Sequence, residues 1–244
     1  MKKRENWDIE KFNRINLPEV VGLIQDPKGF SKNNGIRVLD MPVKMVGTNL
    51  RFPKNIKKTY QDIVRQAIEK EVMDHGSIDD FYVYITIDQK MVKKGKTGRR
   101  AGAHSDGYIE RGNKQIDITE NAYDIVSTEK GEVSHTYIVH SNTPTEFFNA
   151  KFPILDSSCE GSMKTFDSIA KESEIITYNN FTLLKMTPFV VHRCGIVKED
   201  GPRTFMKISI SKKKYAREGN TKNELFHYNW NYKERSLTNR NHPW

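Results

Sequence analysis

The chain has 244 residues, of which 36% are hydrophobic and 29% charged, a length and balance that suit one folded domain with its own apolar core. Its formal net charge of +9 at pH 7 favours anionic partners such as nucleic acid, acidic protein or a carboxylate substrate, although it equally serves solubility. Only two cysteines and no long apolar run occur, which excludes a disulfide framework and a membrane-spanning helix, so we expect a soluble cytoplasmic protein without membrane partners.

The N-terminal part is expected to wrap irregularly around a later core. Prolines and glycines interrupt residues 1–35, where we expect one short element near Val20–Ile24. Residues 36–46 carry apolar side chains in a strand-like pattern, with an interruption at Pro42.

The clearest helix of the sequence follows Pro53. Its apolar residues recur mostly at steps of three and four and form one stripe: Ile56, Tyr60, Ile63, Val64, Ala67, Ile68 and Val72. His75 and Gly76 provide a stop signal. We expect this helix to brace a sheet.

Strand-like sequence begins at Phe81. Residues 81–87 are almost entirely β-branched and aromatic, and later candidates are short segments of the same character: 101–108, 136–141, 145–152, 175–186, 189–194 and 203–211. Short strands after a single helix predict a sandwich or small barrel rather than alternating βαβ units. We expect one domain over residues 1–244, with the wrap and brace helix at 1–80, the β core at 81–211 and an extension at 212–244.

A candidate metal pair lies at His104 and Asp106. Side chains two residues apart on a strand point to the same face, so the imidazole and the carboxylate can bind one metal together. A first-row metal would need a second histidine, and His192 closes the apolar run of residues 189–191. Arg203 follows eleven residues later, after a turn that contains Gly201 and Pro202.

This order of His-x-Asp, a long gap, His and then Arg resembles that of the Fe(II)- and 2-oxoglutarate-dependent dioxygenases. The resemblance covers roughly residues 81–211 and includes the number of short strands. It implies a mainly β fold with flanking helices, built on a double-stranded β-helix (jelly roll, cupin-like) core and braced by the N-terminal helix.

The resemblance also implies roles for four residues. His104, Asp106 and His192 would be the catalytic iron ligands, and three ligands on one face would leave three positions for 2-oxoglutarate and O₂. Arg203 would bind the distal carboxylate of 2-oxoglutarate with paired charge-assisted hydrogen bonds. The implied reaction decarboxylates 2-oxoglutarate to succinate and hydroxylates a C–H bond of a second substrate.

One position departs from the family pattern. Many relatives place a serine or threonine two residues after the arginine to share the carboxylate, whereas this chain has Phe205. Thr145, at the start of a predicted strand, is our candidate for that hydroxyl, and Tyr137 and Thr143 are alternatives.

Three further residues near the candidate site are given structural interpretations. His135 and His140 are five residues apart and should face opposite sides of one strand, so we assign them structural or second-sphere roles. Cys194 is expected to be a buried packing residue.

Two basic segments bear on the second substrate. Residues 90–100 contain six positive charges and no negative one, which would either steer an anionic substrate or form an ordinary solvated loop. After the basic run 212–214, aromatic residues alternate at Phe226, Tyr228, Trp230 and Tyr232, either to stack on bases or, as we favour, as a strand that covers the outer face of the sheet. The nucleic-acid demethylases of the family carry a second arginine where this chain has Ser209, which argues against base repair.

The second substrate is left open between a small metabolite, a nucleotide, nucleic acid and an acidic peptide or protein side chain. Two alternatives to an oxygenase are also open. One is a non-catalytic jelly-roll module that binds a metal or another ligand, and the other is a basic nucleic-acid-binding protein.

Overall fold

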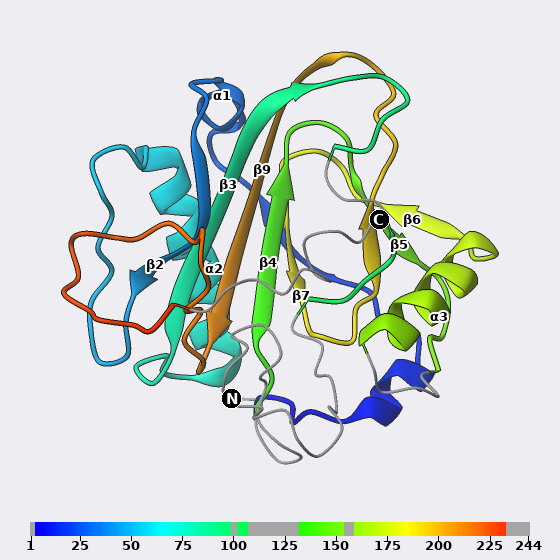
Figure 1. The fold of residues 1–244 in the computed structure, drawn as a ribbon, viewed down its shortest axis with the longest axis horizontal. Helices are drawn as coiled ribbons and strands as arrows, with labels where there is room; N and C mark the ends of the chain where they lie inside the picture. Colours follow the sequence, from blue (N-terminus) through cyan, green and yellow to red (C-terminus); the bar gives the residue numbers. More distant parts are fainter. Residues whose placement is uncertain (1–2, 99–101, 107–131, 154–158, 233–244) are drawn as a thin grey trace.

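The computed structural model describes residues 3–98, 102–106, 132–153 and 159–232 (Figure 1). The helical elements are η1 (Ile9–Asn13), α1 (Pro27–Ser31), α2 (Lys58–His75) and α3 (Cys159–Lys171). The strands are β1 (Glu19–Leu23), β2 (Arg37–Lys44), β3 (Tyr82–Val92), β4 (His135–His140), β5 (Thr145–Phe148), β6 (Ile175–Thr177), β7 (Thr182–Met186), β8 (His192–Cys194) and β9 (Gly201–Ser211). Within this part of the chain no helix is long and apolar enough to cross a membrane.

The strands form two antiparallel sheets. The larger has the order β1-β7-β4-β9-β3-β2, and the smaller has the order β6-β5-β8. From β4 to β9 the chain passes repeatedly between the sheets, since β5, β6 and β8 belong to the small sheet while β4, β7 and β9 belong to the large one. The expected fold is confirmed: the protein is mainly β, with a jelly-roll, cupin-like core and flanking helices.

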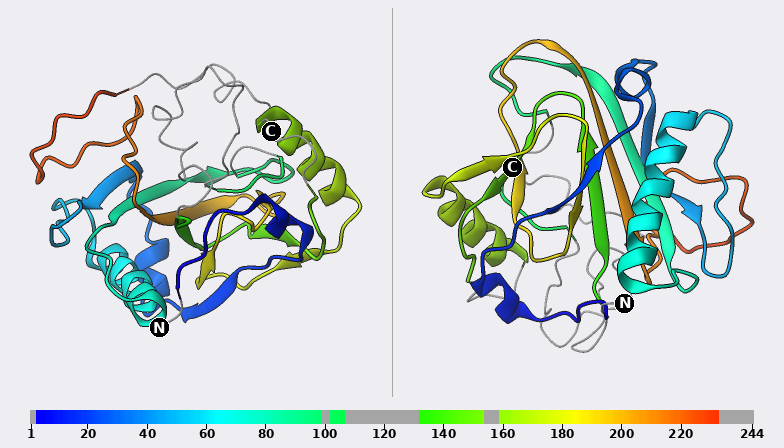
Figure 2. Two further views of the ribbon diagram at one scale, coloured as in Figure 1. Left: turned by 90° about the horizontal axis from the view of Figure 1, so that it is seen from below. Right: turned by 180° about the vertical axis from the view of Figure 1, so that it is seen from behind.

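Helix α2 braces one face of the large sheet, as its apolar stripe predicted (Figure 2). The registers of β3 with β9 and of β4 with β9 place one set of alternate residues on the face toward α2: Val83, Ile85, Ile87, Tyr137, Val139, Met206, Ile208 and Ile210. These side chains share a buried cluster with Tyr60, Ile63, Val64 and Ala67 of the helix. The helix ends at Gly76, whose φ of 87° suits glycine and whose N–H bonds to the Val72 carbonyl at 2.8 Å.

The opposite face of the large sheet looks into the space between the two sheets. Because side chains alternate along a strand, this face carries Thr86 of β3 and Arg203, Phe205 and Lys207 of β9. Apolar side chains from both sheets fill part of that space: Ile138, Phe147, Leu184, Met186, Val190 and Phe205. The candidate site lies beside this cluster.

Helix α3 was not anticipated from the sequence. Phe166 on this helix packs against Phe12 of η1 with ring centroids 5.5 Å apart, and Phe189 packs edge-on against the same Phe12 ring at 5.4 Å. The side chains that bury α3 therefore come from distant parts of the chain. The helices η1 and α1 were also missed.

Three strand predictions need correction. The predicted strand 175–186 is two strands, because a turn with Phe181 at φ 65° carries the chain from the small sheet to the large one. Of the predicted strand 101–108, residues 102–106 contain only an isolated bridge at His104, and the rest lies outside the described residues. Pro42 does not interrupt β2, which lies at an end of the sheet where a missing N–H is tolerated.

The C-terminal aromatic segment also differs from its prediction. Residues 221–232 form no strand, and Trp230 packs edge-on against Tyr82 of β3 at a centroid distance of 5.8 Å. Tyr82 pairs with Ser211 in the register that also pairs Thr86 with Lys207. The segment therefore covers the face of β3 that points away from α2, rather than the outer face (Figure 2).

Candidate metal centre

Backbone hydrogen bonds hold His104 and His192 side by side. The N–H of each residue donates to the carbonyl of the other at 2.9 Å, which makes an antiparallel bridge. Residues directly opposite in such a bridge have side chains on the same face. The two imidazole rings accordingly lie 4.6 Å apart between centroids. The pairing joins positions 88 residues apart in the sequence.

The imidazole rings of His104 and His192 are oriented in the same way, with Nδ1 toward a backbone carbonyl and Nε2 away from it. The Nδ1 atom of His104 lies 3.0 Å from the Gly102 carbonyl, and that of His192 lies 3.1 Å from the Val190 carbonyl. A carbonyl only accepts, so each Nδ1 is the donor of its contact and Nε2 is the nitrogen that each ring leaves for a metal. Burial, helped by the nearby His104, lowers the pKa of His192 to about 4. This ring is therefore neutral at neutral pH, as a metal ligand must be.

Asp106 completes a group of three ligand atoms. Its Oδ2 atom lies 4.0 Å from His192 Nε2, and one ligand atom from each of His104, Asp106 and His192 lies within 4.8 Å of the others. Two imidazole nitrogens and one carboxylate oxygen form the donor set typical of non-haem Fe(II). The residues present therefore fit an iron ion.

Helix α3 anchors the segment that carries His104. The buried Ala103 donates its backbone N–H to Asp167 Oδ1 of this helix at 2.6 Å. The segment that carries His104 is thus held from two sides, by Asp167 of α3 and by the bridge to His192.

Arg203 is the third residue of β9 and is 2% exposed. Its Nε donates to the Asn142 carbonyl at 3.1 Å, and its guanidinium lies 5.1 Å from the centre of the Phe205 ring. The register of β9 places the side chain on the interior face. Gly98 lies against it, since a Cβ added at residue 98 would be 3.1 Å from Arg203 Cδ and 3.2 Å from Nε. Gly98 was not predicted as a site residue, because nothing in its local sequence indicates a contact with residue 203.

The three candidate hydroxyls have different surroundings. Thr145 pairs with Cys194 across β5 and β8 while Phe147 pairs with His192, so Thr145 shares the interior strand face of Phe147. Thr143 has a φ of 58°, and its Oγ1 is buried without a hydrogen-bond partner among the described residues. Tyr137 is the wrong candidate: it lies on the α2 side of the large sheet, where its hydroxyl donates to Glu71 Oε2 at 2.6 Å.

The two other histidines of β4 lie on opposite faces of the strand. His140 is inside, with Nδ1 3.2 Å from Asn180 Oδ1, and burial together with the Arg203 charge lowers its pKa to about 4. His135 is on the α2 side, with Nδ1 2.7 Å from Glu71 Oε1. Cys194 is half-buried rather than buried.

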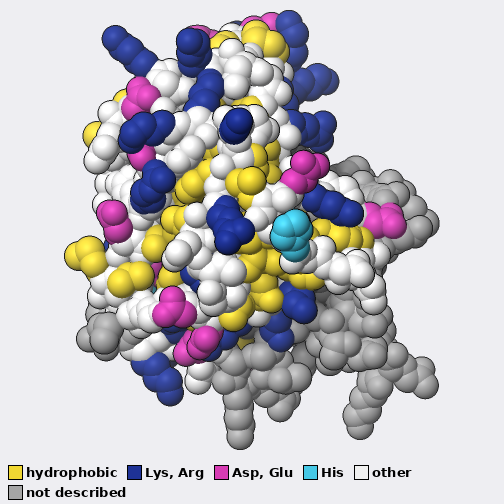
Figure 3. All heavy atoms as spheres, turned by 90° about the vertical axis from the view of Figure 1, so that its left-hand side faces the viewer, with side chains coloured by type: hydrophobic (Ala, Val, Ile, Leu, Met, Phe, Trp, Pro, Cys, Tyr) yellow, Lys and Arg dark blue, Asp and Glu magenta, His cyan; other side chains and the backbone are white. Residues whose placement is uncertain are grey.

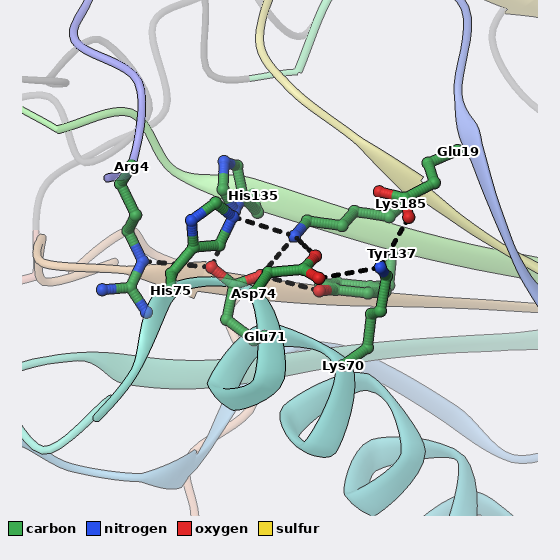
Figure 4. A network of polar contacts seen from close by, with 9 residues as sticks. All are labelled: Arg4, Glu19, Lys70, Glu71, Asp74, His75, His135, Tyr137 and Lys185. Carbon is green, nitrogen blue, oxygen red and sulfur yellow. Dashed lines mark hydrogen bonds and ion pairs between the residues drawn. The ribbon is translucent and has the colours of Figure 1, made fainter. Parts of the chain in front are cut away.

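Glu71, His75 and His135 form a second group with metal-like spacing (Figure 4). Cations already surround the carboxylate: Arg4 Nε lies 3.1 Å from Oε1, and Lys185 Nζ lies 3.2 Å from Oε2. Burial alone would raise the pKa of Glu71, but hydrogen bonds and charges from His135 and Lys185 hold it well below the ordinary value. We interpret this group as a polar network that ties the N-terminal segment, α2, β4 and β7 together.

Some of the basic residues near the site already have a partner, Asp200. Lys93 Nζ lies 2.8 Å from Asp200 Oδ2, and the Lys94 N–H donates to Asp200 Oδ1 at 2.7 Å. Arg99 and Arg100 lie outside the described residues. On the face shown in Figure 3, the lysines and arginines of the described residues are dispersed among apolar and uncharged side chains rather than gathered in one continuous patch.

The sequence matches no protein-family model, and no curated protein matches it. Several solved structures are similar in fold. AviO1 from Streptomyces viridochromogenes Tue57 aligns with a TM-score of 0.41 and 9% identity over 83% of this chain and 92% of its own. HygX from Streptomyces hygroscopicus with iron bound aligns with a TM-score of 0.44 and 8% identity over 85% of this chain and 87% of its own. The nickel complex of ThoJ, a non-heme monooxygenase, aligns with a TM-score of 0.40 and 11% identity over 84% of this chain and 77% of its own. These similarities assign the chain to no family.

Proposed function

We propose that the protein is an Fe(II)- and 2-oxoglutarate-dependent oxygenase that hydroxylates a C–H bond of a second substrate. The observation that carries the proposal is the convergence of His104, Asp106 and His192, whose ligand atoms lie within 4.8 Å of one another. A buried arginine on the interior face of the same jelly roll adds the second requirement, a cation for a dicarboxylate.

The chain's own residues would divide the work as follows. His104 and His192 would bind the metal through Nε2, because their Nδ1 atoms donate to carbonyls. Arg203 would bind the distal carboxylate of 2-oxoglutarate, and Thr145 would supply a hydroxyl to the same group. When bound, the iron supplies the redox chemistry by which O₂ oxidises both substrates. In the balanced reaction 2-oxoglutarate, O₂ and R–H yield succinate, CO₂ and R–OH.

The arginine separates this function from the non-catalytic alternative. The guanidinium is 2% exposed and contacts both Gly98 and the Phe205 ring on the interior face of the large sheet. Its Nε donates to the Asn142 carbonyl, which helps to fix its orientation. A dicarboxylate cosubstrate would give this interior cation a chemical role that a module binding only a metal does not require.

The second substrate is proposed to be anionic. Lysines 93, 94 and 96 are exposed in the segment that leads to Gly98, and Gly98 contacts Arg203. Positive charge at this position would raise the local concentration of a nucleotide, nucleic acid or acidic peptide. On the face shown in Figure 3 the positive charges form no continuous patch of the kind that a nucleic-acid-binding scaffold would use.

The test is anaerobic binding of Fe(II) followed by 2-oxoglutarate. Calorimetry gives the two affinities, and succinate formation after addition of O₂ gives the turnover that occurs without the second substrate. His104→Ala should lose metal binding and turnover, whereas Arg203→Gln should keep the metal and lose 2-oxoglutarate. The matched controls are His227→Ala and Arg37→Gln, because both side chains are exposed. Fe(II) binding that survives in His104→Ala, or 2-oxoglutarate binding that survives in Arg203→Gln, would contradict the proposal.

A further inference from the structure

Lys207 lies between two carboxylates beside the candidate metal ligands. Its Nζ atom is 3.9 Å from Asp106 Oδ1 and 3.8 Å from Asp40 Oδ1, and its side chain is 11% exposed. It shares the interior face of β9 with Arg203 and Phe205, at steps of two residues. Lys207 was not predicted as a site residue, although its position four residues after Arg203 places it on the same face of the strand.

The local structure around Asp40 holds this carboxylate in place. Asp40 lies at a register shift of β2, between Val38 and Met41, and has a φ of 41°. Its N–H donates to Thr86 Oγ1 at 3.0 Å, and the Thr86 hydroxyl donates to Asp40 Oδ1 at 3.0 Å. Thr86 is the direct partner of Lys207 in the register of β3 and β9. A strained backbone of this kind persists only where surrounding contacts enforce it.

Asp40, held by Thr86, is therefore a second carboxylate beside Lys207, in addition to Asp106. It is 2% exposed, and its Oδ2 has no hydrogen-bond partner among the described residues. A buried lysine or aspartate alone is unfavourable, whereas the pair compensates both charges. A bound metal ion would neutralise part of the negative charge of Asp106. Lys207 would then still have the Asp40 carboxylate as an ion-pair partner.

The two oxygens of Asp106 face different groups. Oδ2 is directed toward His192 Nε2 at 4.0 Å, while Oδ1 lies toward Lys207 at 3.9 Å. Carboxylates can bind a metal through one oxygen or through both. An ammonium group on the side of Oδ1 favours binding through Oδ2 alone.

We propose that Lys207, fixed by Asp40, is a positioning residue that keeps Asp106 a one-oxygen metal ligand. The inference rests on the proposed metal site and adds how the coordination number is controlled. If Asp106 binds through one oxygen, a six-coordinate metal held by His104, Asp106 and His192 would keep three positions for the 2-oxo acid and O₂. Loss of the Lys207 charge would release Oδ1 to the metal and occupy one of them.

The test uses Co(II)-loaded protein, because the visible absorption of Co(II) depends on its coordination number. Lys207→Met removes the charge and keeps an apolar side chain of similar length, whereas Lys207→Arg keeps the charge. We expect Lys207→Met to change the Co(II) spectrum and to weaken 2-oxoglutarate binding about tenfold, within the range typical of residues that support metal ligands. Lys207→Arg should restore both, and Asp40→Asn should shift both in the same direction as Lys207→Met.

The outcomes separate this inference from the proposed function. Wild-type protein that binds no Co(II) would refute the metal site itself. Normal Co(II) and 2-oxoglutarate binding with an unchanged spectrum in Lys207→Met would refute only the positioning role. Weaker 2-oxoglutarate binding with an unchanged spectrum would assign Lys207 to the cosubstrate, and a lower melting temperature as the sole change would make it structural; both would overturn the proposal.

Discussion

Gly98 and Arg203 are in direct contact, so close that a single methyl group at residue 98 would lie 3.1 Å from the arginine side chain. The contact joins the end of the basic segment to the start of β9. The same guanidinium lies 5.1 Å from the centre of the Phe205 ring, so Gly98 and Phe205 both restrict its position.

Substitution of Gly98 should therefore weaken 2-oxoglutarate binding without affecting the metal. Overpacking of a filled site costs about 1–3 kcal/mol, so we expect Gly98→Ala to lower the affinity for 2-oxoglutarate about fivefold or more. Calorimetry on metal-loaded protein measures this. Gly201→Ala is the matched control, because its Cβ would lie at an ordinary 3.7 Å from Asn142 Nδ2. Equal effects of the two substitutions would refute the specific role of Gly98.

Arg203→Lys should retain the metal and bind 2-oxoglutarate poorly. Lysine keeps the positive charge but cannot donate two parallel hydrogen bonds to one carboxylate, and it lacks the planar surface that lies over Phe205. Loss of one charge-assisted hydrogen bond is worth about 1.5–3 kcal/mol, which predicts an affinity lower by about tenfold to a hundredfold. Titration of the Fe(II)-loaded variant with 2-oxoglutarate measures this affinity. Wild-type affinity in this variant would mean that residue 203 acts as a simple point charge.

Removal of the Glu71 charge should lower the free energy of unfolding more than removal of a surface charge. Glu71→Gln would leave Arg4, His135 and Lys185 without their shared carboxylate, and breaking such a buried pair costs about 3–5 kcal/mol. Urea unfolding measures the free energy. Asp62→Asn is the control, because Asp62 pairs with Lys58 and Arg65 on the surface of the same helix and should change little. A small loss in Glu71→Gln would contradict the structural role.

The same network predicts how stability responds to acid. Since the pKa of Glu71 is lower in the folded protein than its ordinary value of 4.5, the folded state binds fewer protons at this group than the unfolded state. Its contribution is complete above pH 4.5 and decreases as the pH falls through and below that value. Urea unfolding of wild-type and Glu71→Gln protein between pH 7 and pH 3 tests this. The difference between the two should shrink on acidification, and a constant difference would contradict the ionised Glu71.

Local patterns in the sequence were sufficient for the main elements and the proposed ligands. The apolar stripe of residues 56–72 predicted the brace helix, and the β-branched run at 81–87 predicted β3. The order of His104, Asp106, His192 and Arg203 identified residues of which the first three meet in space. Local patterns of this kind are informative because a helix or a strand has a fixed period, which determines which nearby residues share a face.

The tertiary structure alone decided which distant side chains meet. Gly98 contacts Arg203, Asp40 lies by Lys207, and Glu71 collects partners from three other segments. Each of these pairings depends on the register between strands, on the bulge in β2 or on how α2 packs against the large sheet. Because a shift of one residue turns a strand's side chains to the other face, no local pattern could specify them.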